Sequence, residues 1–235
     1  MAIINVSDIS VEVIKKDIKN LHLWVYPPHG NVRVASPHHI DDEAIRLLVV
    51  WKLTWIKKQI KSFVAQRRET VREYVSWESH YYFWKRYLLN VIELDSHSKI
   101  KVKIRNKKYI DLYVKKNSST EQRKKIMDKW LRSKLKSQCE KSLKVWKEIT
   151  GLEINEFKIR VMKTKWWSCN IEAKKILINF ELVKKDKKHL EYIILHELIH
   201  LIERNHNDNF NFHLDKYLPN WRIYRQNLND SILTI

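Results

Sequence analysis

The chain has 235 residues, 44% of them hydrophobic, which is enough to bury a core in one large domain or two small ones. Its formal charge of +19 favours an anionic partner such as nucleic acid, a nucleotide or a membrane surface, although lysine enrichment from an AT-rich genome would produce the same excess. No apolar run is long enough to span a membrane, no secretory signal is present, and two cysteines make no disulfide framework, which predicts a cytoplasmic protein with no membrane partner.

Strands separated by turns are expected at the start of the chain. The segments within 3–35 alternate apolar and polar residues, with Pro27 and Gly30 among the turn residues. Apolar residues then recur every three or four positions across 41–74, which predicts a helix. Strands are expected again across 80–115, where the alternation returns in part.

A long helix is predicted next. Ser119 and Gln122 have the spacing of a capping box, and Gly151 is the residue type that commonly ends a helix. The helix is therefore expected to run as far as Thr150, with its many lysines in solvent. Its core-facing side chains are expected to be Ile126, Trp130, Leu135 and Leu143.

The last part of the chain is predicted to hold two strands, at 157–162 and 174–180, and a helix across 186–205. This order of elements predicts an α+β fold without an internal repeat. We expect a β-rich N-terminal region with one long helix at 1–117, followed by a second domain at 118–235.

His196 and His200 lie four residues apart in this last helix, so their side chains share one face of it. Two imidazoles at this spacing can reach one zinc ion at roughly 2.0–2.1 Å. Glu197 follows the first histidine, where its carboxylate can take a proton from a metal-bound water. Because the helix is otherwise apolar, burying these groups without a metal would be unfavourable. The other interpretation is a helix whose polar residues only cap and solvate it.

A third metal ligand is expected after the helix. We favour His206, ten residues after His196, with Asn205 in a left-handed conformation that ends the helix and turns the chain back. Glu203, His213 or a water molecule are the alternatives. A metzincin is not favoured, because that class has a glycine where Glu203 stands and a methionine turn farther along the chain.

Several motifs occur in one order along the chain. They are VYPPHGNVRVASP at 25–37, ESHYYFWKRYLLNV at 78–91, KWWSCN at 165–170, ILIN at 176–179, HELIHL at 196–201, NHNDNF at 205–210, and Pro219 with Trp221. In these motifs the chain resembles the YgjP-like metallopeptidase family, relatives of the SprT-like and minigluzincin proteins. The resemblance implies that His196, His200 and His206 bind Zn2+ or another divalent metal. It also implies that Glu197 is the catalytic base in a small zincin-like domain, with a twisted sheet packed on the active-site helix.

The same motifs indicate where a substrate would lie. We expect Trp166, Ser168 and Asn179 to contact it. Zincins commonly hold an extended peptide along an edge strand, and residues 174–180 are interpreted either as that strand or as a core strand. Cys169 is expected to pack beside the metal site rather than to bind the metal.

The chain departs from the family pattern in one direction. Tryptophan stands at three glycine positions of the motifs, Trp77, Trp84 and Trp167, and Trp24 is a fourth candidate. The chain holds 2 glycines and 10 tryptophans, although average usage predicts roughly 16 glycines. Glycine positions often need a positive φ, which a large side chain disfavours. We therefore hypothesise that the source genome reads UGA as glycine and that these codons were translated as tryptophan.

Three functions fit these observations. The first is hydrolysis of a peptide substrate by a zinc enzyme. The second is a metal-dependent pyrophosphatase acting on a UTP-like nucleoside triphosphate, which the positive charge favours and the lack of a glycine-rich phosphate loop disfavours. The third is a DNA-associated, SprT-like protease module. In it the aromatic side chains either stack on bases or pack in the core; they are Tyr81, Tyr82, Trp84 and Tyr87.

Overall fold

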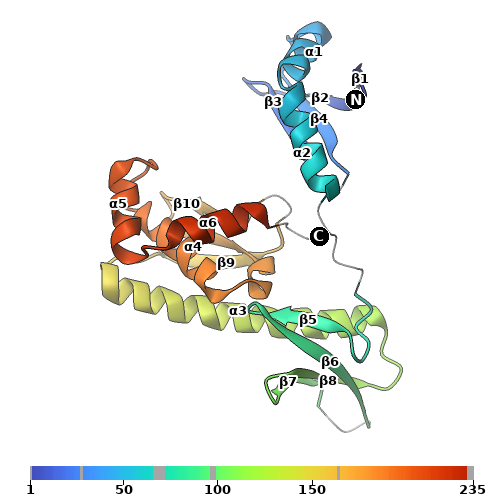
Figure 1. The fold of residues 1–235 in the computed structure, drawn as a ribbon, viewed down its shortest axis with the longest axis vertical. Helices are drawn as coiled ribbons and strands as arrows, with labels where there is room; N and C mark the ends of the chain where they lie inside the picture. Colours follow the sequence, from blue (N-terminus) through green and yellow to red (C-terminus); the bar gives the residue numbers. More distant parts are fainter. Residues whose placement is uncertain (1, 27–28, 66–71, 96–98, 163–164, 232–235) are drawn as a thin grey trace. The chain divides into compact units, whose positions relative to one another are not determined.

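The computed structural model describes residues 2–26, 29–65, 72–95, 99–162 and 165–231. Within this part of the chain the fold is mixed α+β, with several small sheets and one long helix (Figure 1), in agreement with the predicted fold class. The chain forms two compact units, Met1–Arg68 and Glu69–Ile235. None of the described helices is long and apolar enough to cross a membrane.

The first unit is a four-stranded sheet with two helices. Its elements are β1 (Ala2–Val6), β2 (Ile9–Lys15), β3 (His22–Tyr26), β4 (Asn31–Ser36), α1 (Asp42–Trp51) and α2 (Leu53–Ala65). The strand order is β1-β2-β4-β3, with β2 and β4 parallel and the other pairs antiparallel. The helix predicted across 41–74 is therefore two helices that meet at Lys52, and part of its predicted end, 66–71, lies outside the described residues.

Alternation along β2 and β4 explains how this sheet buries one face. The buried cross-strand pairs are Val11 with Val32 and Val13 with Val34. Ile45 of α1, which is also fully buried, belongs to the same apolar cluster. The turn before β4 needs glycine, because Gly30 has a φ of +75° and a Cβ there would lie 2.8 Å from Cγ1 of Ile60.

The second unit begins with a sheet of the same topology. Its strands are β5 (Ser79–Tyr82), β6 (Lys85–Leu94), β7 (Lys101–Arg105) and β8 (Tyr109–Lys115). The order is β5-β6-β8-β7, with β6 and β8 parallel and the other pairs antiparallel. The two sheets therefore repeat one strand order and one set of strand directions, a structural repeat that we did not expect from the sequence.

A helix of 31 residues, α3 (Thr120–Thr150), follows this sheet. Both of its predicted end signals are confirmed: Ser119 and Gln122 form a capping box, and Gly151 ends the helix with a φ of 70°. Of the four side chains predicted to face the core, Leu135 is fully buried and three are partly buried: Ile126, Trp130 and Leu143. The buried apolar face follows a neighbouring line of residues: Met127, Leu131, Leu135, Cys139 and Trp146.

The last part of the second unit holds a small sheet and the helices around it. These elements are β9 (Glu156–Arg160), β10 (Trp167–Asn170), β11 (Lys175–Asn179), the 3₁₀ helix η1 (Phe180–Lys184), α4 (Lys187–Ile199), α5 (Asp208–Tyr217) and α6 (Trp221–Asp230). The strand order is β10-β11-β9, so β11 is the central strand. The interpretation of residues 174–180 as an edge strand is therefore wrong, and the core-strand alternative is confirmed.

One hydrophobic core joins the two sheets of the second unit. It includes Leu89 on β6, Leu135 on α3 and Ile194 on α4. Figure 1 shows α3 extending from the β5–β8 sheet to β9 and α4, which agrees with its contacts to β8 and α4. Because this core includes residues on both sides of position 117, the domain boundary that we expected there falls inside a compact unit.

Two of the four tryptophans suspected to be glycines lie in left-handed backbone. The β5–β6 hairpin turns through Phe83 (φ 43°) and Trp84 (φ 67°), as in a type I′ turn, whose second position favours glycine. Trp77, before β5, has a φ of 72°. Trp24 and Trp167 instead lie within strands and have no positive φ. The backbone argument for glycine therefore applies to positions 77 and 84 only.

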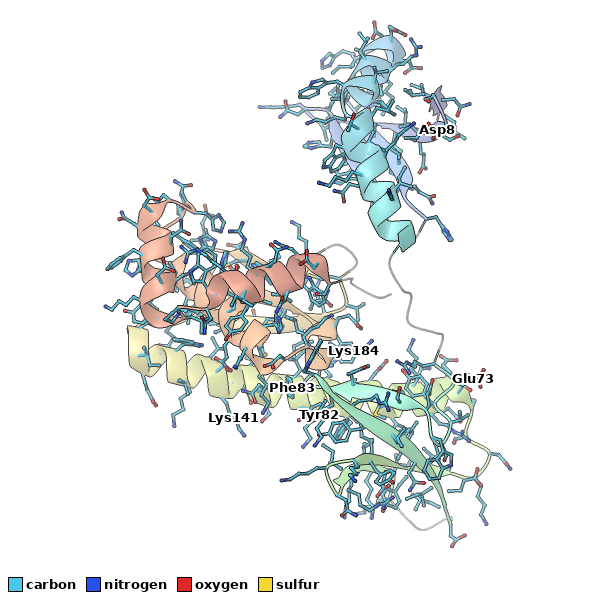
Figure 2. All side chains as sticks on the ribbon, in the orientation of Figure 1. Asp8, Glu73, Tyr82, Phe83, Lys141 and Lys184 are labelled. Carbon is cyan, nitrogen blue, oxygen red and sulfur yellow. The ribbon has the colours of Figure 1, made fainter. Side chains whose placement is uncertain are left out.

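Backbone hydrogen bonds hold the tip of the β5–β6 hairpin. Figure 2 shows Tyr82, Phe83 and Lys184 close together, where the hairpin meets η1. The Phe83 N–H donates to the Val183 carbonyl (2.7 Å), and the Trp84 N–H donates to the Lys184 carbonyl (3.2 Å). These bonds involve the main chain alone, so the turn conformation does not depend on the indole of Trp84.

Candidate metal centre

Helix α4 starts at the N-cap Asp186 and is buried on every side over most of its length. Its buried residues are His189, Leu190, Tyr192, Ile193, Ile194, Leu195, His196, Glu197, Leu198 and Ile199. A helix that is buried all round lies inside a core. His196 and Glu197, with 6% and 2% of their surface exposed, therefore do not solvate the helix. The interpretation of this segment as a helix with merely solvating polar residues is wrong.

Three histidine side chains converge at the end of α4. The Nε2 atom of His196 lies 3.2 Å from Nε2 of His200 and 3.0 Å from Nε2 of His206. One ligand atom from each ring lies within 4.8 Å of the others. Ligands about 2.0–2.1 Å from a tetrahedral zinc ion are separated by about 3.3 Å, so the spacing fits such an ion.

Hydrogen bonds at the far side of the rings orient two of these histidines. Nδ1 of His200 lies 3.1 Å from the backbone carbonyl of Glu203. Because a carbonyl can only accept, Nδ1 carries the proton, and Nε2 of the neutral ring keeps a free lone pair. The Tyr192 hydroxyl lies 3.4 Å from Nδ1 of His196. Such partners hold metal-binding imidazoles in place in many proteins.

A tight turn after α4 brings His206 back to the other two histidines. The helix ends at Ile199, and the N–H groups of Ile202 and Glu203 both donate to the Ile199 carbonyl. Asn205 has no positive φ, so our expectation that a left-handed Asn205 turns the chain is wrong. The hydrogen-bonded turn at 201–203 does so instead, which a search for a single glycine-like residue misses.

The two alternative third ligands lie elsewhere. The carboxylate of Glu203 accepts from the backbone N–H of Asn205 (3.3 Å), and so it stabilises the turn. The ring of His213 stacks on Tyr217, with 6.5 Å between ring centroids and 9° between ring planes. Neither side chain belongs to the histidine cluster, as far as the described residues extend.

Burial favours the neutral form of two of the three histidines. It lowers the pKa of His196 to about 3, and the neighbouring His200, His206 and Arg225 add to this effect. Burial is also the main cause of the lowered pKa of His206, with further contributions from His200 and Arg225. Neutral imidazoles offer lone pairs, which is the form that a metal ion needs. The donor set therefore fits a divalent metal at neutral pH.

The carboxylate of Glu197 lies beside this cluster. Its Oε1 is 4.0 Å from Nε2 of His196, and its buried Oε2 has no hydrogen-bond partner among the described residues. Burial raises the pKa of Glu197 to about 7, against hydrogen bonds from the side chains of Cys169 and Trp167 that lower it. A buried carboxylate that titrates near neutral pH suits proton transfer, and its free oxygen leaves a place for a water or a substrate.

The cluster and Glu197 open into a pocket of about 520 Å³. The residues that line it are Lys165, Trp167, Ser168, Cys169, Ile171, Tyr192, His196, Glu197, His200, Arg204, His206, Arg225 and Asn229. They come from edge strand β10 and the residues on either side of it, from α4, from the turn that follows α4, and from α6. Titratable residues from separate parts of the chain thus meet in one cavity.

A comparison with models of known protein families identifies the family of this chain. The profile described as "YgjP-like, metallopeptidase domain" matches residues 19–231. The chain belongs to the YgjP-like metallopeptidase family. As a member it is a metal-dependent hydrolase, and the histidine cluster could hold the divalent metal that the family implies.

Two solved structures resemble part of this YgjP-like chain. One is the metallopeptidase zymogen abylysin of Pyrococcus abyssi, with 21% identity, a TM-score of 0.36, and coverage of 38% of this chain and 90% of that chain. The other is the metallopeptidase zymogen jannalysin of Methanocaldococcus jannaschii, with 28% identity, a TM-score of 0.33, and coverage of 40% and 91%. A comparison with curated proteins gives no match.

The three predicted substrate contacts of the YgjP-like chain do not lie together. Ser168 lines the pocket. Trp166 does not line it: its indole is buried and donates to the backbone carbonyl of Leu228 (2.9 Å). Asn179 is fully buried, and its side-chain amide donates to the carbonyls of Met162 and Lys165. The latter two residues therefore shape the segment before β10 and do not face the cavity.

The sequence also contained pocket residues that we did not single out. Tyr192 lies one helical turn before His196, so the same four-residue spacing that relates the two histidines of α4 could have found it. Cys169, by contrast, was expected to pack beside the metal site, and it lines the pocket. Arg225 lies far along the chain, on α6, and no spacing rule links it to α4.

Proposed function

We propose that this YgjP-like chain is a zinc-dependent peptidase whose HELIH segment, on α4, is the active-site helix of a zincin-like domain. His196, His200 and His206 hold the zinc ion, and Glu197 is the catalytic base. One observation carries the proposal: three Nε2 atoms converge beside a buried carboxylate with an unpartnered oxygen. A structural metal site needs no such carboxylate, because its ligands close the coordination shell.

Each of these residues has a defined task in the proposed reaction. The chemistry that a bound zinc ion supplies is Lewis acidity, which polarises the substrate carbonyl and makes water easier to deprotonate. Glu197, with a pKa near 7, removes a proton from the attacking water and afterwards gives it to the leaving nitrogen. Tyr192 and the carbonyl of Glu203 keep the rings of His196 and His200 in place.

The edge of β10 is the proposed binding place for an extended peptide. Among the described strands, β10 pairs with β11 alone, so its other side offers backbone groups. Ser168 and Cys169 of this strand line the pocket that contains Glu197. A peptide that pairs with this edge has one of its bonds beside the carboxylate. The edge role that we first gave to residues 174–180 thus moves to β10.

Neither of the other two functions is favoured. The family assignment concerns a metallopeptidase domain and gives no support to a nucleotide pyrophosphatase. Of the aromatic residues considered for base stacking, Tyr87 is buried in the core, and Tyr82 packs on Trp130 with 5.2 Å between ring centroids. These two rings therefore do not form a platform for nucleic acid.

Replacing the proposed base tests this function most directly. In Glu197→Gln we expect kcat/KM on casein-derived peptides to fall by about 10²- to 10⁴-fold, because the amide cannot accept the proton. Bound zinc, measured by atomic absorption, should stay at the wild-type level. Glu148→Gln, an exposed change on α3 outside the pocket, is the matched control, and its activity should stay close to that of the wild type. Full activity in Glu197→Gln would contradict the proposed base.

Removing the third histidine tests the metal ligands separately. We expect His206→Ala to lower zinc affinity by at least about 100-fold in a competition titration, because two imidazoles alone hold the ion weakly. His213→Ala serves as the matched control and should bind zinc like the wild type. If His206→Ala kept wild-type affinity and His213→Ala lost it, the ligand assignment would be wrong.

A further inference from the structure

The pocket has more cationic than anionic side chains among its described lining residues. Three cationic side chains, Lys165, Arg204 and Arg225, line it, and Glu197 is its only carboxylate among the described residues. Arg204 has a distant partner in Glu172, at 3.9 Å. Lys165 and Arg225 have no ion-pair partner in the described part of the chain. Two cations that line the same pocket as the proposed base are therefore available to a ligand.

A pair of arginines on α6 shows the difference between a structural and an available cation. The guanidinium of Arg222 binds both carboxylate oxygens of Asp215, and the charge of Arg222 keeps the pKa of that carboxyl low. Arg225, one turn farther along, makes no such pair, although its guanidinium lies 5.9 Å from the centre of the Trp221 ring. Arg225 is thus positioned beside an aromatic ring but not neutralised by a carboxylate.

Aromatic contacts connect Arg225 to the metal cluster. Trp221, which lies next to the guanidinium, stacks on Tyr192 with 6.1 Å between ring centroids and 11° between ring planes. The hydroxyl of Tyr192 in turn reaches His196. Arg225, His196 and His206 also line one pocket. The guanidinium therefore lies close enough to the cluster to act on the same bound molecule.

Lys165 lines the same pocket. The residue after it, Trp166, donates its indole N–H to the carbonyl of Leu228, which fixes this segment to the end of α6. Asn229, also on α6, lines the pocket as well. One ammonium, one guanidinium and one amide thus line one pocket. Such a set of donors is typical of a site for a carboxylate.

We propose that Arg225 and Lys165 form a subsite that binds a carboxylate of the peptide substrate next to the bond that is cut. This inference rests on the proposed peptidase function and adds a substrate class to it: peptides with an acidic side chain, or a free C-terminus, beside the cleaved bond. Arg225 is a specificity residue in this assignment, because its planar guanidinium can bind both oxygens of a carboxylate.

Three matched peptides separate the two sources of the carboxylate. They are acetyl-Ala-Ala-Glu-Ala-Ala-amide, the same peptide with Gln in place of Glu, and the Gln peptide with a free C-terminus. We expect the wild-type zinc enzyme to prefer one carboxylate peptide over the Gln amide by about 10- to 100-fold in kcat/KM. A preference for the first peptide assigns the subsite to acidic side chains, and a preference for the third assigns it to the C-terminus.

Variants of Arg225 then test the residue itself. Arg225→Gln should remove most of the preference, and Arg225→Lys should retain part of it, because lysine keeps the charge without the planar fork. Arg86→Gln is the matched control: Arg86 is exposed on β6, outside the pocket, and its loss should leave the preference unchanged. An unchanged preference in Arg225→Gln would overturn the proposal.

A binding measurement distinguishes failure of this inference from failure of the peptidase function. In the Glu197→Gln background, isothermal titration with the three peptides should show the same preference, and adding Arg225→Gln should remove it. Cleavage without a carboxylate preference would overturn the subsite alone. Absence of cleavage of any peptide would contradict the peptidase function. Tighter binding of UTP than of either carboxylate peptide, lost in Arg225→Gln, would assign the subsite to phosphate and overturn the proposal.

A second inference rests on the backbone and not on the pocket. Trp77 and Trp84 have φ values of 72° and 67°, in a region that large side chains rarely adopt. Their indoles are 73% and 63% exposed, so little burial offsets the unfavourable backbone. We infer that the natural protein has glycine at positions 77 and 84, from codons that its source reads as glycine.

One peptide decides this question. Trypsin cleaves after Arg72 and Lys85, so residues 73–85 form a single fragment that contains both positions. We expect mass spectrometry of the protein purified from its natural source to show glycine at both positions, and we expect UGA at both codons of the gene. Tryptophan in this fragment, with UGG codons, would overturn the inference.

Discussion

The two four-stranded sheets of this chain have the same strand order and the same strand directions, but they are used differently. The first is followed by α1 and α2, which are separated at Lys52, and among the described residues its core consists of side chains of this unit. The second is followed by the unbroken α3, whose 31 residues reach from the sheet to α4. In the first unit the sheet therefore packs with the two helices that follow it. In the second unit a sheet of the same topology supports the candidate metal centre.

The length of α3 explains the difference. Near its start, Met127 and Leu131 belong to the core that contains the β5–β8 sheet. Near its end, Ser142 and the indole of Trp146 both donate to the carboxylate of Glu191 on α4. A helix of 31 residues is about 46 Å long, which is enough to serve both partners. Helix α3 thereby connects the second sheet to α4.

Matched truncations in the two cores test this contrast and should have the largest effect on stability. Leu135 of α3 and Ile45 of α1 are both fully buried, so each change to alanine should lower the unfolding free energy of its own unit by about 2–5 kcal/mol. Chemical denaturation followed by hydrogen exchange should show Leu135→Ala acting on the second unit and Ile45→Ala on the first. If either variant reduced protection from hydrogen exchange in both units, the two cores would not stabilise their units separately, and the contrast would be wrong.

Zinc should stabilise the two units unequally. A metal that binds the folded second unit at about 100 times its Kd adds about 2.7 kcal/mol to the stability of that unit, because the unfolded chain lacks the site. The first unit holds no part of the histidine cluster, and its protection from hydrogen exchange should stay the same. His206→Ala is the control, in which zinc should protect neither unit at that concentration. Equal protection of both units in the wild type would mean that they unfold together.

Local signals in the sequence predicted much of this structure, because they act over a few residues. The capping box at Ser119 and the left-handed Gly151 fixed the ends of α3, and the four-residue spacing placed His196 and His200 on one face. Partners distant in the chain were harder to predict. Strand order depends on pairing between segments, so the central place of β11 was not visible in its own residues.

The same limit applies to the site. Asn179 is a polar residue in a motif, and its sequence does not tell whether it faces a cavity or, as the structure has it, bonds the backbone of a neighbouring segment. Arg225 reaches the pocket only because α6 packs on α4. The net charge around a site depends on which distant segments the fold brings together, so it cannot be predicted from any one segment of the sequence.

Substitutions in the hairpin turns should have the smallest effect on the unfolding free energy, and they test a further difference between the two sheets. The first sheet turns between β1 and β2 through Ser7 and Asp8, of which Ser7 alone has a positive φ, whereas the equivalent turn of the second sheet has a positive φ at both Phe83 and Trp84. Small polar residues tolerate left-handed backbone better than an indole does. Trp84→Gly should therefore raise the unfolding free energy of the second unit by about 1 kcal/mol, measured by urea denaturation.

Trp24→Gly is the matched control for that change. Trp24 lies within β3, without a positive φ, and its ring stacks on His22 with 5.5 Å between centroids. Glycine inside a strand is unfavourable, so this variant should lower the unfolding free energy of the first unit by about 0.5–1 kcal/mol. Opposite signs for the two substitutions would tie the benefit of glycine to the left-handed turn, whereas stabilisation by both would mean that an exposed indole is unfavourable whatever its backbone.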